Sequence, residues 1–237
     1  MARQPLAFDT YLGHLVAEAA RFDAAIASAP PDVRVPACPD WDRGELRDHQ
    51  AGVLAFWRRQ LADDASPQTG PVADGVEQDA ARSVEALAAD MAARLTALGP
   101  DRPCWNWSGE RQVSGWVARR MAQEISVHRV DAESIAGPAA PIADEMAADG
   151  IDELLDVFVD ARPGMPVAGG VVTELFDEQR RAVLTPEGAV RTEAEPTARL
   201  TGTASDVLLA LWGRTNDASW TGDDRAAPIW ADLAEFE

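Results

Sequence analysis

The sequence predicts an α+β protein in which a bundle of helices over residues 1–162 is followed by a small α+β domain over residues 163–237. Two patterns predict this division. Apolar residues recur every three or four positions through the first two thirds of the chain, as they do in amphipathic helices. After residue 164, short strand-like runs separated by turn residues replace that pattern. The composition, 46% hydrophobic and 26% charged over 237 residues, is that of a globular protein rather than a disordered or fibrous one.

Four helices are expected in the first part, and a fifth leads toward the boundary. Segments rich in proline and glycine separate them, because neither residue continues a helix well. The sharpest start is at Asp42, since Glu45 three residues later completes a capping box. The predicted ranges are about 8–27, 42–63, 75–98 and 114–135, with the fifth helix opening at about 141–144.

The second part is expected to combine short strands with two helices. Strand-like runs lie near residues 171–172, 182–184, 189–191 and 198–200, and turn residues such as Pro186 and Gly188 separate them. Helical patterns follow at about 205–212 and 227–236. Strands grouped before helices are typical of an α+β unit rather than an alternating α/β fold.

The net charge excludes several classes of function. Forty acidic residues against twenty-one basic ones give −19 at pH 7, and the isoelectric point is about 4.4. Such a chain is a poor match for nucleic acid or for an anionic membrane surface, because both bind mainly through cations. All the basic residues are arginine. The chain therefore has no lysine for a Schiff base or a phosphate-binding loop.

The cysteines and the apolar runs indicate a cytoplasmic, soluble protein. Cys38 and Cys104 are too few for a disulfide framework, and their spacing is not that of a zinc or redox motif. We expect a buried structural role for Cys38 rather than a nucleophilic one. The sequence begins without a signal-peptide pattern, and no apolar run reaches the ~18 residues of a membrane span.

Three polar residues occupy stripes where the core of a bundle requires apolar side chains. His49 lies on such a stripe of the second helix, and Glu124 and His128, four residues apart, share a face of the fourth. A buried carboxylate needs a cation or a strong hydrogen-bonding partner. A divalent metal would satisfy all three residues and leave positions open for other ligands. The alternative is an ordinary pair of Glu124 and His128 on the helix surface, with His49 as a hydrogen-bonded core histidine.

Several segments resemble the mycothiol-dependent maleylpyruvate isomerase family of the DinB-like superfamily. The first runs from Val35 to His49, with His49 eight residues after Trp41. The others are Arg119–Glu133, Pro141–Leu154, Leu200–Arg214 and Thr221–Asp223. The resemblance covers nearly the whole chain in order, and it implies a DinB-like four-helix bundle with a family C-terminal domain.

The resemblance also implies cofactors and site residues. It places a divalent metal, usually zinc, on His49, Glu124 and His128, the same residues that the helical stripes select. It implies mycothiol, the low-molecular-weight thiol of actinobacteria, as cofactor. Arg214 matches the Gly-Arg position of the family and is a candidate for binding an anionic substrate or the thiol. The chain departs from many relatives at Gln123, where they carry histidine, so contacts around the metal ligands differ there.

The function implied is that of a thiol-dependent metalloenzyme acting on a small electrophile. A metal-stabilised thiolate would add to an unsaturated carbonyl or acid, giving either isomerisation or simple S-transfer. The sequence does not separate an isomerase from an S-transferase. A non-catalytic binding or regulatory module that keeps the bundle is the alternative. We expect a monomer or weak homodimer.

Overall fold

The computed structural model describes residues 5–62, 82–108, 111–159, 172–175, 180–185, 188–190, 195–214 and 217–234. The chain forms two compact units, Leu6–Ala140 and a second one that contains Pro141–Glu237. The boundary predicted between residues 162 and 163 lies outside the described residues. In the structure the fifth helix belongs to the second unit, because it packs against α6 of that unit.

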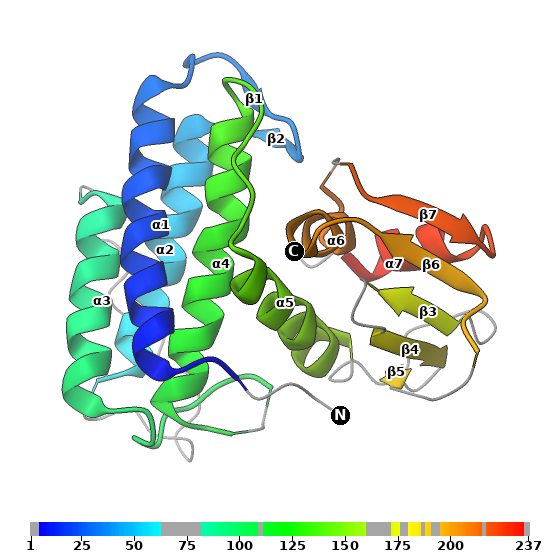
Figure 1. Ribbon diagram of the computed structural model, residues 1–237. Coiled ribbons are helices and arrows are strands. Elements are labelled where there is room, and N and C mark those ends of the chain that lie inside the picture. The colour runs from blue at the N-terminus through cyan, green and yellow to red at the C-terminus, as the bar shows by residue number, and fades with distance from the viewer. Residues whose placement is uncertain are drawn as a thin grey trace. The chain divides into compact units, whose positions relative to one another are not determined.

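In the described part of the first unit, four helices pack against one another (Figure 1). Helix α1 contacts α3 and α4, and helix α2 also contacts both of these helices. The predicted third helix has its first residues, 75–81, outside the described part of the chain. The helices are α1 (Phe8–Ser28), α2 (Arg43–Gln60), α3 (Val84–Leu98) and α4 (Ser114–Ser134).

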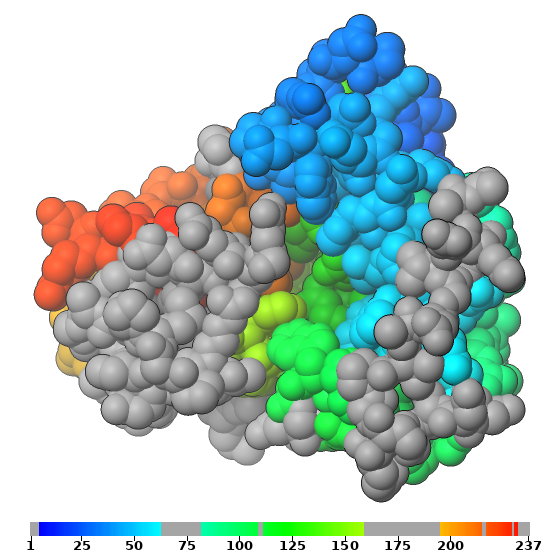
Figure 2. Space-filling view, turned by 180° about the vertical axis from the view of Figure 1, so that it is seen from behind, coloured from blue at the N-terminus to red at the C-terminus, as the bar shows by residue number. Residues whose placement is uncertain are grey.

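A short hairpin precedes α2 and determines where that helix begins. Strands β1 (Arg34–Val35) and β2 (Cys38–Asp42) pair antiparallel, where the sequence indicated only a non-helical connection. The predicted capping box is confirmed. The Asp42 carboxylate accepts from the backbone N–H of Glu45 at 3.0 Å, and the Glu45 carboxylate accepts from the N–H of Asp42 at 2.7 Å. Figure 2 shows the hairpin segment next to α2 on the surface of this unit.

A partly buried ion network joins α1 to α4. Arg129 of α4 is fully buried, and its Nε donates to Glu18 of α1 at 2.6 Å. Its Nη1 donates to Glu133 at 3.0 Å, and Arg21 of α1 contacts both carboxylates, at 2.9 Å for Glu18 and 2.8 Å for Glu133. Because every charge has an opposite neighbour, the network tolerates burial and holds the two helices in one register.

The second unit is α+β, as the sequence predicts. Helix α5 (Asp144–Glu153) continues into the π-helical turn η2 (Leu154–Val159). A mixed sheet has the order β5-β4-β3-β6-β7, in which only β3 and β6 pair in parallel. The sequence did not indicate β7. The remaining elements are β3 (Val172–Leu175), β4 (Arg180–Thr185), β5 (Gly188–Val190), β6 (Ala198–Thr201), α6 (Ala204–Leu211), β7 (Ser219–Gly222) and α7 (Ala226–Ala234).

Gly222 closes β7 where a side chain has no room. Its φ of 88° lies in the left-handed region, and a Cβ there would lie 2.3 Å from the carbonyl oxygen of Thr197. The N–H of Asp223 donates to that same carbonyl at 2.9 Å. Glycine is therefore required for the chain to leave the sheet at this point. Among the described residues, no helix is both long enough and apolar enough to span a membrane.

Candidate metal centre

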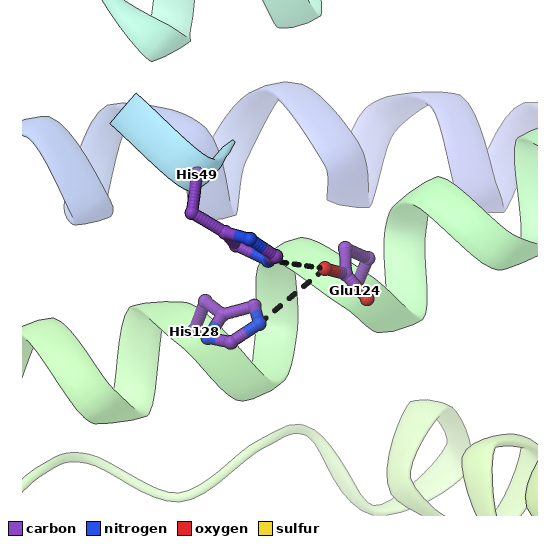
Figure 3. Close-up of side chains that lie close together, drawn as sticks. All are labelled: His49, Glu124 and His128. Carbon is purple, nitrogen blue, oxygen red and sulfur yellow. Dashed lines mark hydrogen bonds and ion pairs between the residues drawn. The ribbon is translucent and has the colours of Figure 1, made fainter. Parts of the chain in front are cut away.

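Helices α2 and α4 bring His49, Glu124 and His128 together (Figure 3). Nε2 of His49 and Nε2 of His128 each lie 3.3 Å from the same oxygen, Oε1 of Glu124. One potential ligand atom from each residue lies within 4.8 Å of the other two. The three side chains that the helical stripes select thus converge on one point.

The burial of the three residues differs from the prediction in one respect. The side chain of His128 is 11% exposed, Glu124 is 22% exposed and His49 is 33% exposed. The buried face of α2 contains Leu46 and Leu54. His49 lies at the edge of this face rather than in the core. The His49 side chain thus stays partly accessible to solvent.

Further side chains hold the Glu124 carboxylate in place. Arg120, one turn earlier on α4, donates to Oε2 at 3.2 Å, and its own side chain is 5% exposed. Gln50 of α2 donates to Oε1 at 3.2 Å. Both carboxylate oxygens therefore have a fixed donor on the protein, which orients Oε1 toward the two histidines.

The ring nitrogens of His128 face two different carboxylates. Nε2 faces Glu124, and Nδ1 lies 2.9 Å from Oδ2 of Asp131. The indole of Trp41 lies against the ring of His49 with a centroid distance of 4.7 Å, and at 6.3 Å from that of His128. Trp41 and the carboxylates of Glu124 and Asp131 therefore restrict rotation of the two imidazole rings.

The electrostatics of the site favour a cation between the three groups. Burial opposes ionisation of Glu124, but the hydrogen bonds from His128 and His49 and the charge of Arg120 outweigh it and hold the pKa of Glu124 well below its ordinary value. Burial also opposes the charged form of His128, yet Asp131 and Glu124 outweigh it and raise the pKa of His128 to about 9. Without a metal, a proton on Nε2 supplies the positive charge that faces Glu124.

The donor set fits a divalent metal. Two imidazole nitrogens and one carboxylate oxygen are the ligands of many catalytic zinc sites, and the same set also suits other first-row divalent ions. His128 would hold a metal only through an unprotonated Nε2, so binding of a metal would release the Nε2 proton.

Family models place the chain among known proteins. The model for the mycothiol maleylpyruvate isomerase N-terminal domain matches residues 12–133, which include all three residues of the centre. The model for the C-terminal domain of the same enzymes matches residues 145–228. The chain belongs to the mycothiol-dependent maleylpyruvate isomerase family.

Solved structures agree with this family in fold. A crystal structure of the mycothiol-dependent maleylpyruvate isomerase is 14% identical with a TM-score of 0.58, and the match covers 92% of this chain and 95% of that one. A histidine-to-alanine mutant of that enzyme gives a TM-score of 0.54 at the same identity and coverage. No curated protein sequence matches the chain. The likeness to the maleylpyruvate isomerase structures extends over both compact units.

Arg214 lies outside the unit that carries the metal centre. It follows the end of α6, and its Nη1 donates to the carbonyl of Trp212 at 2.6 Å. The contact closes the end of the helix, as a residue in the last turn often does. A role of Arg214 in binding an anionic ligand remains a prediction for this member of the maleylpyruvate isomerase family.

The cysteines are not part of the centre. Cys104 is buried, its thiol lies 3.4 Å from the carbonyl of Gln60, and burial raises its pKa to about 11. Cys38 is half-buried in β2. A thiol with a raised pKa is a poor nucleophile at neutral pH, which agrees with a structural role for Cys104.

Sequence reasoning missed the residues that support the ligands. Asp131 and Arg120 both stand on α4 at helical spacing from a ligand, three residues after His128 and four before Glu124. That spacing was a usable signal, because residues three or four apart share a helix face. Gln50 gave no such signal, since it is adjacent to His49 and its reach to α4 depends on how the helices pack.

Proposed function

We propose that this chain is a metal- and mycothiol-dependent isomerase of a small unsaturated carbonyl acid. The observation that carries the proposal is the convergence of His49, Glu124 and His128 at a partly exposed point within the domain that the family model matches. A regulatory module has no need to hold two imidazoles and a carboxylate around an accessible cation site. We place the reaction in the cytoplasm, where a small thiol stays reduced.

His49, Glu124 and His128 would hold the metal, with zinc as the best match to the ligand set. The metal would supply a Lewis acid that favours the thiolate form of the cofactor over the thiol at neutral pH. Arg120 and Gln50 keep the Glu124 carboxylate oriented. A small molecule would reach the metal from the side of the partly exposed His49.

The isomerisation consumes no thiol, because the thiolate that adds to the substrate is released again. Attack of the thiolate on an alkene carbon moves the π electrons onto the carbonyl oxygen as an enolate, and leaves a single bond that can rotate. Collapse of the enolate restores the double bond in the trans geometry and expels the thiolate unchanged. We propose that Arg214 holds a carboxylate of the substrate or of the thiol, because its planar charged group binds carboxylates through two parallel hydrogen bonds.

Turnover with a substoichiometric thiol tests the proposal. Zinc-loaded protein is mixed with a cis-dienoic acid and mycothiol at one tenth of the substrate concentration. We expect full conversion to the trans isomer with the thiol recovered. Consumption of one thiol per substrate would indicate S-transfer instead, and conversion without thiol would contradict the proposal.

The chain offers a matched control for this assay. It has three histidines, and the third, His14, lies on α1 with its Nε2 2.8 Å from Oγ of Ser126. His14→Ala should keep thiol-dependent turnover, whereas His49→Ala should abolish it. Loss of turnover in both variants would show that the assay reports folding rather than the centre.

A further inference from the structure

Asp131 is a buried carboxylate beside a metal ligand. It stands three residues after His128 on α4, its side chain is 1% exposed, and its Oδ2 lies 2.9 Å from Nδ1 of His128. Residues three apart on a helix share a face, so the backbone of α4 itself sets this contact. The distance is that of a charge-assisted hydrogen bond.

The contact determines which nitrogen of His128 is free. A carboxylate only accepts hydrogen bonds, so Nδ1 must carry the proton that joins it to Asp131. In the neutral imidazole the lone pair is then on Nε2, and Nε2 is the atom that faces Oε1 of Glu124 at 3.3 Å. The opposite tautomer would place a lone pair against the Asp131 carboxylate and a proton in the metal position.

We propose that Asp131 is a positioning residue that holds His128 in the Nδ1–H tautomer and presents Nε2 as the metal ligand. The inference rests on the metal site of the proposed function and not on its substrate. It also makes the two histidines unequal. Among the described residues, no hydrogen bond reaches Nδ1 of His49, whose ring instead packs against Trp41. Within the described part of the chain, His128 is thus the one of the pair whose tautomer a carboxylate sets.

Zinc affinity measured by competition with a chromophoric chelator tests this without any substrate. Asp131→Ala should weaken zinc binding by about 10- to 100-fold, the usual cost of losing such a support. Asp131→Asn should weaken it less, because the amide oxygen still accepts from Nδ1 but carries no charge. The cobalt-loaded Asp131→Ala protein should also show an altered ligand-field spectrum.

Glu133→Gln is the matched control, since Glu133 is a carboxylate on the same helix that faces Arg21 and Arg129 instead of a histidine. It should lower the melting temperature and leave zinc affinity unchanged. Equal zinc affinity in wild-type protein and in both folded Asp131 variants would overturn the positioning role. If Asp131→Ala does not fold, the zinc affinity of Asp131→Asn alone decides whether Asp131 has the positioning role. Failure of the wild-type protein to bind zinc would instead contradict the proposed function.

Discussion

Each residue of the centre is constrained by a second residue that is not a ligand. Asp131 faces His128, Arg120 and Gln50 hold the two oxygens of Glu124, and Trp41 packs on His49. Such supports orient the ligands before a metal arrives and so reduce the entropy lost on binding. Substitution of such a supporting residue should therefore change metal affinity, whereas substitution of a residue that only packs should change stability alone.

Arg214→Lys distinguishes a substrate-binding arginine from a helix-terminal one. A lysine keeps the positive charge but cannot form two parallel hydrogen bonds to a carboxylate. We expect kcat/KM to fall by about tenfold or more, with metal content and melting temperature unchanged. Steady-state kinetics with the cis-dienoic acid measure this. Wild-type kinetics in the lysine variant would argue for a structural role of Arg214 at the end of α6, where it contacts the Trp212 carbonyl.

Replacing both cysteines by serine should preserve thiol-dependent turnover. The buried Cys104 thiol has a pKa of about 11, and the nucleophile in our account is the small thiol, not a protein side chain. The assay compares turnover of the double variant with that of wild-type protein at equal zinc content. A folded, zinc-loaded double variant without turnover would make a protein thiol the nucleophile.

At the scale of elements, α4 carries two of the three proposed metal ligands and also the ion network that joins it to α1. Glu124 and His128 face α2, while Arg129 and Glu133 face Glu18 and Arg21. The network links α4 to α1, and the capping box fixes the start of α2 at Arg43, six residues before His49. Helices α4 and α2 are thus each stabilised by a local feature that the sequence encodes separately from the site.

Glu133→Gln should lower stability in a pH-dependent way. Burial raises the pKa of Glu133, but the N–H of Ala140 and the charges of Arg129 and Arg21 outweigh it, and the pKa in the folded protein is lowered. A lowered pKa stabilises the fold above the unfolded value near 4.5, and this contribution is lost as pH falls through the folded value.

We therefore expect the variant to lose about 1–2 kcal/mol at pH 7 and progressively less below pH ~4.5. Denaturant unfolding at a series of pH values measures this. A difference from wild type that stays constant down to pH 3 would argue against an ionised Glu133 in the network.

At the scale of the whole molecule, the chain divides its chemistry between two compact units. The three proposed metal ligands all lie in Leu6–Ala140, and Arg214 lies in the other unit. Metal binding should therefore need only the first unit, while catalysis should need both. A substitution that disturbs the second unit alone tests this division.

Gly222→Ala is such a substitution. Alanine tolerates a φ of 88° poorly, and its Cβ would meet the Thr197 carbonyl at 2.3 Å. We expect a destabilisation of more than about 1 kcal/mol in the transition that unfolds the second unit. Zinc stoichiometry, measured below that transition, should stay at the wild-type value. A folded variant without zinc would show that the centre depends on the second unit.

Most of the fold, and the three residues that converge at the candidate centre, could be predicted from the sequence, because both depend on local patterns. The Asp42 and Glu45 pair marks the start of α2, and helical spacing puts Glu124 and His128 on one face. The edge position of His49 could not be predicted, because it depends on how far α2 is rotated against its neighbours. Strand β7 was missed since its four residues show little alternation, and their described partner is β6, about twenty residues earlier.

Zinc stoichiometry of the His128→Ala variant, measured by elemental analysis beside His14→Ala, tests the central claim most directly. Wild-type protein and His14→Ala should each bind one zinc ion per chain. His128→Ala should bind none after dialysis yet keep its helicity, because apolar packing supplies most of the stability of the helices. One tightly bound zinc ion in the His128→Ala protein would contradict a metal centre at His49, Glu124 and His128.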